Sequence, residues 1–193
     1  SVSADARFVA FSTKNSTLVE GDNNQVLDVF VYDRASKMTT LVSMSTEGIQ
    51  GNKSSSDPLL SADGRYVAFS SEADNLVEGD TNGQSDVFLH DRTKKTTIRV
   101  SINTTGDQGN GGARFPSLSA DGLVVAFVST STNLGWGKTY TGDTNGDNTD
   151  IFVRDLSVGA TTVVNVDTDG TQYSGSPGSN SDGQFSLSAD GQY

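Results

Sequence analysis

The stretch SADGRYVAFS, at Ser61–Ser70, decides the fold, because the chain repeats it. It occurs earlier as SADARFVAFS at Ser3–Ser12 and later as SADGLVVAFV at Ser119–Val128. The last residues, SADGQY at Ser188–Tyr193, begin it once more. Self-similarity of this kind within one chain is typical of repeat architectures.

Two further blocks recur in phase with the first one. A block that starts Asp-Val-Phe or Asp-Ile-Phe stands at Asp28–Arg34, Asp86–Arg92 and Asp150–Leu156. Each is followed by a threonine-rich block, and these three blocks read TTLVS (39–43), TTIRVS (96–101) and TTVVNV (161–166). The first two units align without a gap, whereas the third carries insertions at 133–142 and 173–183.

Each unit is predicted to contain four short strands. The first strand is clearest around Pro116–Ser119, at the start of the third unit. The second, third and fourth strands are clearest in the second unit, at Arg65–Ser70, Asp86–Asp91 and Thr97–Ser101. Ser-Ala-Asp-Gly supplies a turn, because glycine adopts positive φ at no steric cost. Four strands repeated in tandem at this spacing are typical of β-propeller blades, and no helical period interrupts them.

The sequence therefore predicts an all-β fold of β-propeller blades, each a four-stranded antiparallel sheet. We assign blade 1 to residues 1–58, blade 2 to 59–116, blade 3 with its insertions to 117–185, and the first strand of a fourth blade to 186–193. Since a propeller ring has about four blades or more, three blades and one strand indicate part of a larger ring or array.

Composition supports this fold and excludes several classes of function. The 193 residues include 24 acidic and 13 basic side chains, and the formal net charge is −11. Nearly all the acids are aspartate, which favours turns and hard-cation sites over helices. No basic stripe suits a nucleic-acid backbone, no apolar run is long enough to span a membrane, and no cysteine is present.

A loop between the second and third strands of each unit carries the strongest chemical signal. The pattern is Asp-x-Asn followed by a further Asp, so oxygen-bearing side chains alternate around a short loop. Calcium takes about 6 to 8 oxygen ligands, and neither sulfur nor histidine lies nearby to favour zinc or copper. We therefore predict up to three Ca²⁺ sites, with these ligands: Asp22, Asn24, Val26, Asp28, Asp80, Asn82, Gln84, Asp86, Asp143, Asn145, Asp147 and Asp150.

A simpler interpretation of these loops stays open. Asp, Asn and Gly favour turns by themselves, so each loop could be a turn and nothing more. The third loop has the most carboxylates and is the best candidate for a metal. The first is the weakest, because Gln25 stands where the other two loops have glycine.

Together, SADGRYVAFSS, NLVEGDTNGQSDVF, HDR and TTIRVS of the second unit resemble repeats of the TolB-type, or WD-like, propeller family. More narrowly, they resemble repeats of long secreted bacterial proteins built from many such blades. The resemblance implies a periplasmic, extracellular or cell-surface location and a non-catalytic binding or scaffolding role, sometimes beside a fused peptidase. The first unit departs from the pattern, because Asp5-Ala6 replaces Asp-Gly.

Other side chains were weighed as candidate sites. His90, the only histidine, is predicted to be exposed and not catalytic, because Tyr32 and Arg154 replace it in the other units. Asp33–Arg34 and Asp91–Arg92 are interpreted as charge clusters that pair locally. Two aromatic residues of an insertion are candidates for contact with a sugar or a protein: Trp136 and Tyr140.

The sequence thus predicts a non-catalytic, calcium-stabilised propeller protein with a structural or interaction role outside the cell. Partners would be proteins or further copies that bind exposed blade surfaces, with carbohydrate as another candidate. One alternative is a subunit of an extracellular filament built by blade-to-blade stacking. Another is a propeller domain of a larger hydrolase or polysaccharide lyase, although one histidine cannot supply the histidine cluster that a lyase needs.

Overall fold

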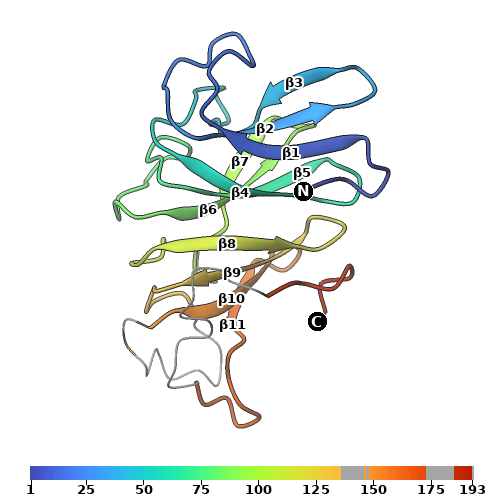
Figure 1. Cartoon of the computed structure of the whole chain (residues 1–193). Coiled ribbons are helices and arrows are strands. Elements are labelled where there is room, and N and C mark those ends of the chain that lie inside the picture. Colours follow the sequence, from blue (N-terminus) through green and yellow to red (C-terminus); the bar gives the residue numbers. More distant parts are fainter. Residues whose placement is uncertain (136–145, 147, 173–184, 193) are drawn as a thin grey trace.

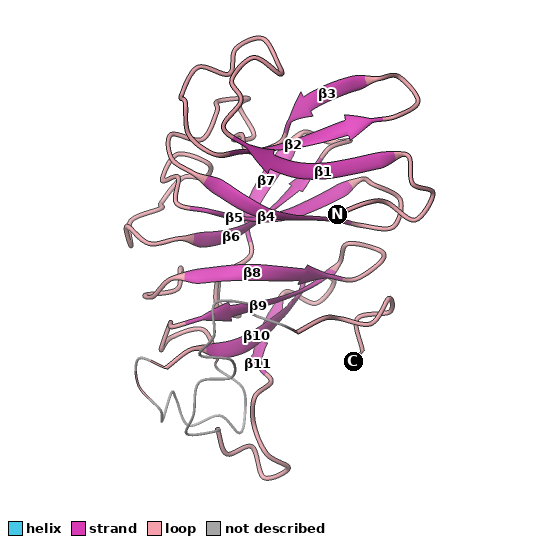
Figure 2. Cartoon of the chain, in the orientation of Figure 1, coloured by secondary structure: helices cyan, strands magenta, loops and turns pink. Residues whose placement is uncertain are grey.

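The computed structural model describes residues 1–135, 146, 148–172 and 185–192. Within these residues, eleven strands form three antiparallel sheets that lie side by side in one stack (Figures 1 and 2). The described part of the chain contains no helix that could cross a membrane. The predicted all-β architecture is therefore confirmed.

The first sheet consists of β1 (Phe8–Thr13), β2 (Asp28–Asp33) and β3 (Met38–Leu41) in that order. A single bridge between Val2 and Val9 stands where the other sheets have a complete innermost strand. This sheet therefore has three strands, where the repeat predicts four.

The second and third sheets each have the four strands that the repeat predicts. Their strands are hydrogen-bonded in sequence order, and both sheets have the same register between corresponding strands. The strands are β4 (Ser55–Leu60), β5 (Tyr66–Ser71), β6 (Asp86–Asp91), β7 (Thr96–Arg99), β8 (Ala113–Leu118), β9 (Val124–Ser129), β10 (Asp150–Asp155) and β11 (Ala160–Val163).

The strands β4 and β8 are bulged at the same place. The register shifts between Ser56 and Leu59 in β4, and the corresponding shift occurs in β8. Each bulge contains a proline, which cannot donate a ladder hydrogen bond and is tolerated at sheet edges and bulges. The residue before each proline, Asp57 or Phe115, has a φ of 54°. Such bulges bend a strand and redirect its side chains.

Two hydrophobic clusters fill the spaces between neighbouring sheets. The first joins the valines of β2 to Phe69 and Phe88 of the second sheet, and the second joins Val87 and Leu89 to the third sheet. Each sheet carries one stacked phenylalanine pair, between β1 and β2 in the first sheet and between the two central strands in the other two. Because apolar side chains cover both of its faces, all six residues of β6 are buried.

Candidate metal and interaction sites

The aspartates that begin β2 and β6 are buried beside the predicted metal loops. Asp28 and Asp86 are both fully buried. In the first loop, Nε2 of Gln50 donates to Oδ1 of Asp22 at 2.8 Å and to Oδ2 of Asp28 at 3.0 Å. One amide group thus lies between the two carboxylates that were predicted to bind a cation.

The second loop repeats this arrangement. Nε2 of Gln108 donates to Oδ1 of Asp80 at 2.9 Å and to Oδ2 of Asp86 at 3.0 Å. The other end of the amide is held as well, because Oε1 of Gln108 accepts from the backbone N–H of Thr81 at 3.1 Å. The amide nitrogen is therefore fixed in its orientation toward the carboxylates.

Serine hydroxyls also donate hydrogen bonds to the two buried aspartates. The hydroxyl of Ser43 donates to Oδ1 of Asp28 at 2.6 Å, and Ser101 donates to Oδ1 of Asp86 in the same way. Each hydroxyl oxygen also accepts a backbone N–H at the start of the neighbouring strand, at Val29 or Val87. The cluster therefore fixes the point at which the loop enters the sheet.

The loop asparagines are used to shape the loops. Oδ1 of Asn24 accepts from the N–H of Val26 at 3.0 Å, and its Nδ2 donates to the carbonyl of Gly51 at 2.8 Å. Asn82 makes the corresponding bonds to Gln84 and to Gly109. Gln25 has a φ of 58°, close to the 66° of Gly83, so the first loop keeps the same turn without a glycine.

Electrostatics differ between the two loops. Burial raises the pKa of both Asp28 and Asp86 above the usual range. In the second loop alone, Arg99 forms ion pairs with Asp80 at 3.4 Å and with Asp86 at 3.8 Å. The charge of this loop is therefore partly neutralised by a residue of β7.

The hydrogen bonds of the first two loops occupy the carboxylate oxygens that calcium would need. Among the described residues, no group of three or more acidic or histidine side chains gathers as a metal site. The carboxylate oxygens converge on an amide nitrogen, which repels a cation, so an ion would have to displace Gln50 or Gln108. Calcium binding stays a prediction for these loops.

The third loop is described only in part. Asp143, Asn145 and Asp147 lie outside the described residues. Asp150 begins β10 and accepts a hydrogen bond from Nδ2 of Asn165 at 2.7 Å. Asn165 thus takes the place that Ser43 and Ser101 have beside the other two loops. Trp136 and Tyr140, the candidates for partner contact, also lie outside the described residues.

Sequence reasoning missed the glutamines and serines that complete these clusters. A usable signal existed, because Gln50, Gln108 and Gln172 occupy the same place in the three units. Their partners lie more than 20 residues away in the chain, and loop spacing alone does not identify them.

The prediction for His90 was wrong about its exposure. Its side chain is buried on β6, where Nδ1 lies 2.9 Å from Oγ1 of Thr97. Burial lowers the pKa of His90 to about 4, so the ring is neutral near pH 7. In the third sheet, the guanidinium of Arg154 takes the corresponding place and donates to the carbonyls of Asn103 and Gly159.

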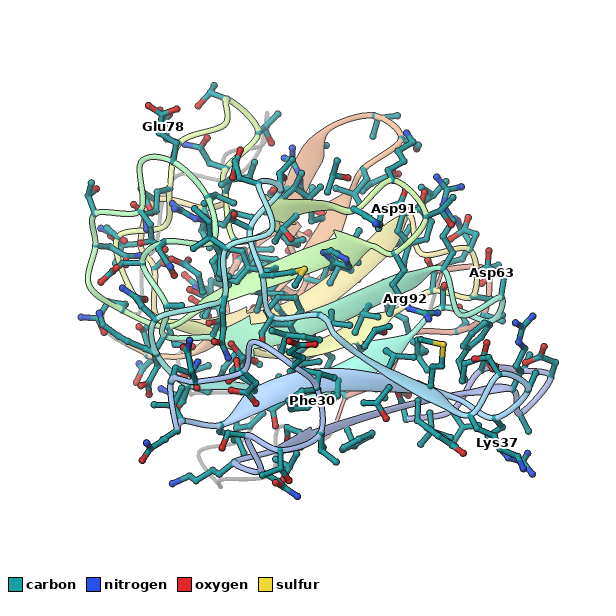
Figure 3. All side chains as sticks on the ribbon, turned by 90° about the horizontal axis from the view of Figure 1, so that it is seen from above. Phe30, Lys37, Asp63, Glu78, Asp91 and Arg92 are labelled. Atoms are coloured by element: carbon teal, nitrogen blue, oxygen red, sulfur yellow. The ribbon has the colours of Figure 1, made fainter. Side chains whose placement is uncertain are left out.

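The strand-end charges also pair differently from the prediction. Asp33 pairs with Arg7 at 2.8 Å, and Asp91 pairs with Arg65 at 2.7 Å. Each arginine lies just before the start of the adjacent strand, so neither aspartate pairs with the arginine that follows it in the sequence. Arg92 instead donates to the carbonyl of Gly64 and lies over the ring of Phe8. Figure 3 shows Lys37, Asp63, Asp91 and Arg92 toward one end of the sheets and Glu78 at the opposite end.

A groove of about 510 Å³ opens between the first and second sheets. Residues of β3 form one side, and His90, Arg92 and Lys95 line the other. A smaller pocket of about 420 Å³ lies at the β4 and β8 bulges and is lined mainly by serines, with Asp57, Glu72, Arg114 and Phe115. The larger groove reaches Gln50 of the first aspartate–glutamine cluster, whereas the smaller pocket is lined by no residue of either cluster.

Comparison with known proteins identifies the fold. No family model matches the chain, and no curated protein matches it. TolB from Agrobacterium tumefaciens superimposes with a TM-score of 0.51 at 18% identity, over 84% of this chain and 46% of that one. Dipeptidyl peptidase 4 from Porphyromonas gingivalis has a TM-score of 0.49 at 14% identity, over 91% of this chain and 27% of that one. The chain thus spans less than half the length of the TolB chain, and its three sheets have the TolB-like β-propeller fold.

Proposed function

We propose that this chain is a run of propeller blades from a larger ring or array, with a non-catalytic structural or interaction role. The observation that carries the proposal is the repetition of the aspartate–glutamine clusters. Both described clusters use their carboxylates in internal hydrogen bonds at equivalent places in neighbouring sheets. A catalytic centre would need a distinct place with available groups, whereas repeated and internally paired clusters suit a scaffold.

The proposed location is outside the cytoplasm, at the cell surface, in the periplasm or in the extracellular medium. This rests on the resemblance of the repeat to secreted propeller proteins. The proposed partners are proteins or further copies that bind the exposed blade faces, with carbohydrate as a second class. Solvent-exposed apolar residues such as Val164 are available for such contacts.

Membership of a larger array can be tested by adding a repeat. Residues 59–116 would be duplicated within the chain, so that two consecutive copies of the second unit stand between the first and third units. In repeat proteins each added interface contributes stability, so we expect a higher melting temperature and a higher urea midpoint. An unchanged or lower midpoint in a folded chain would contradict the proposal.

We also propose that calcium stabilises the chain, chiefly through the third loop with Asp143, Asp147 and Asp150. Ligand at 100 times its Kd would add about 2.7 kcal/mol to the folded state. Titration calorimetry and thermal unfolding in calcium or chelator would test this, with Asp147→Asn as the variant. In the second loop, Gln108→Glu would replace the amide by a third carboxylate and should strengthen calcium binding. Equal melting temperatures in calcium and chelator would contradict calcium stabilisation.

A further inference from the structure

The two joints between neighbouring sheets are built in the same way at their inner ends. The N–H of Ala4 donates to the carbonyl of Ala62, and Ala62 donates in turn to Ala120, both at 2.8 Å. Ala120 then donates to the carbonyl of Ala189 at 2.9 Å. The segment Phe185–Gln192 therefore already occupies the inner part of a third joint.

The outer ends of the joints also repeat. In the first joint, the hydroxyl of Thr97 donates to the carbonyl of Met44, and the N–H of Thr97 donates to Thr46 at 3.1 Å. In the second joint, Thr161 makes the same two bonds, to the residues that correspond to Met44 and Thr46, namely Ile102 and Thr104. At its outer end, each of the two joints thus has a donor side, on the later sheet, and an acceptor side, on the earlier one, whereas the inner backbone hydrogen bonds run in the opposite direction.

Within the described residues, one example of each side is not covered by another sheet. The donor side of the first sheet, the head face, contains Val9, Phe11, Tyr32 and Thr39. These four are only partly buried, whereas the corresponding residues of the second sheet, Val67, Phe69, His90 and Thr97, are buried.

The acceptor side of the third sheet, the tail face, shows the same contrast. Ile151 and Val153 are partly buried and Val164 is 45% exposed, whereas the corresponding Val87, Leu89 and Val100 are at most 3% exposed. Val166 and Thr168 on this face occupy the places of Met44 and Thr46. The head and tail faces are therefore complementary halves of the joint that occurs twice inside the chain.

The segments at the inner edges of the two faces are nearly interchangeable. Ser186–Tyr193 reads SLSADGQY, and Ser1–Phe8 reads SVSADARF. Ser188–Gly191 forms the same turn as Ser3–Ala6, with the same serine-to-aspartate hydrogen bond. A Cβ at Gly191 would lie 2.9 Å from Val124, so alanine is excluded at this place. Ser3–Arg7, which carries Ala6, fits the third joint less well than Ser188–Gln192.

We propose that a second copy of this chain docks its head face on the tail face, with strand exchange at the inner edge. Phe185–Gln192 of one copy replaces Ser1–Arg7 beside β1 of the next, so that Leu187 lies opposite Val9. Thr39 of the second copy then donates to the carbonyl of Val166. Such head-to-tail contacts are heterologous and generate rings or open filaments. This inference deepens the proposed interaction role and rests on it.

Two blocking variants test the direction of assembly. Tyr32→Glu with Thr39→Glu places charge on the head face, and Val153→Glu with Val164→Glu places charge on the tail face. Val158→Glu, at a position that is 73% exposed in a turn, is the matched control. By sedimentation velocity, the unmodified chain and the control should form species larger than the 20.2 kDa monomer as concentration rises.

By itself, each blocking variant should remain a single chain. An equimolar mixture of the two keeps one intact head and one intact tail, so it should give a two-chain species and nothing larger. A monomeric unmodified chain, or self-association of a blocked variant alone, would overturn the proposal. Stabilisation by a duplicated second unit would still support the array, so the two failures are distinguishable.

Because the chain has no cysteine, the exchanged register can be tested separately. Leu187→Cys and Val9→Cys chains, mixed and oxidised in air, should give disulfide-linked heterodimers on a non-reducing gel. Leu187→Cys mixed with Val158→Cys should not. Equal cross-linking in both mixtures, or none in the first, would contradict strand exchange.

Discussion

At the residue scale, the glutamine amides decide how the buried carboxylates are tolerated. A buried, charged carboxylate is costly unless donors surround it. Asp86 has four donors within reach, the amides of Gln108 and Asn82, the Ser101 hydroxyl and, farther away, the Arg99 guanidinium. The raised pKa of Asp86 shows that desolvation still outweighs these donors. Removing one donor should therefore have a measurable cost.

Gln108→Ala is expected to lower the free energy of unfolding by about 2 kcal/mol, because a buried group that loses its partner costs about 1–3 kcal/mol. The variant leaves Asp80 and Asp86 without the amide that they share. Gln84→Ala is the control, because Gln84 is exposed and only its backbone N–H bonds within the loop. Urea unfolding at pH 7 measures both, and equal losses would contradict the role given to the amide.

His90 should give the chain a specific sensitivity to acid. Its pKa in the folded state is lowered to about 4 from 6.5 in the unfolded chain, mainly by burial. Between these values the unfolded state binds the proton, so stability is complete above pH 6.5 and falls toward pH 4. The full loss is about 3 kcal/mol, from about 1.36 kcal/mol per pKa unit.

The variant His90→Gln isolates this effect, since the aspartates are the same in both chains. Unfolding free energies measured from pH 7 to pH 4 should fall less steeply for His90→Gln than for the unmodified chain. Parallel curves would show that His90 does not titrate as inferred.

At the element scale, the Ser-Ala-Asp-Gly turn acts as the contact between neighbouring sheets. Gly122 has a φ of 76°, and a Cβ there would lie 2.4 Å from the ring of Tyr66 in the second sheet. Gly79 has a φ of 74° but nothing within 4 Å of such a Cβ. The two glycines thus share a backbone conformation and differ in packing.

Gly122→Ala should therefore destabilise the chain more than Gly79→Ala. The left-handed conformation costs both variants about 1–2 kcal/mol, and the overlap with Tyr66 adds about 1–3 kcal/mol at Gly122 alone. In a Tyr66→Ala background, the extra cost of Gly122→Ala should shrink, which a double-mutant cycle measures. Additive losses would mean that the ring and the turn are not coupled.

Strands were predictable from sequence because their determinants are local and repeated. The density of apolar residues in 65–70 predicts a strand covered on both faces, and every residue of β5 except Tyr66 is buried. Side-chain partners were not predictable, because they come from distant segments. Asp91 pairs with Arg65 and not with adjacent Arg92, and the loop aspartates meet glutamines that follow the next strands. His90 is buried beside Thr97, on the side of its sheet that faces the first sheet, which its own unit does not reveal.

At the scale of the whole molecule, the sheets are not equally supported. The second sheet packs against a neighbour on both faces, through the two hydrophobic clusters, whereas in the described part of the chain no other sheet covers the outer face of the first or the third sheet. In linear repeat stacks, stability is approximately a sum of repeat and nearest-neighbour interface contributions. Opening should therefore begin at the outer sheets and reach the middle one last.

Hydrogen exchange measured by mass spectrometry would test this order. Peptides that cover β5 and β6 should exchange most slowly, and those that cover β2, β3, β10 and β11 should exchange sooner, by sub-global opening. The measurement is best made on the Tyr32→Glu, Thr39→Glu variant, because assembly would protect the end faces. Uniform protection across the three sheets would mean that they unfold as one cooperative unit. Faster exchange in β6 than in β2 would contradict the argument that the second sheet, covered on both faces, opens last.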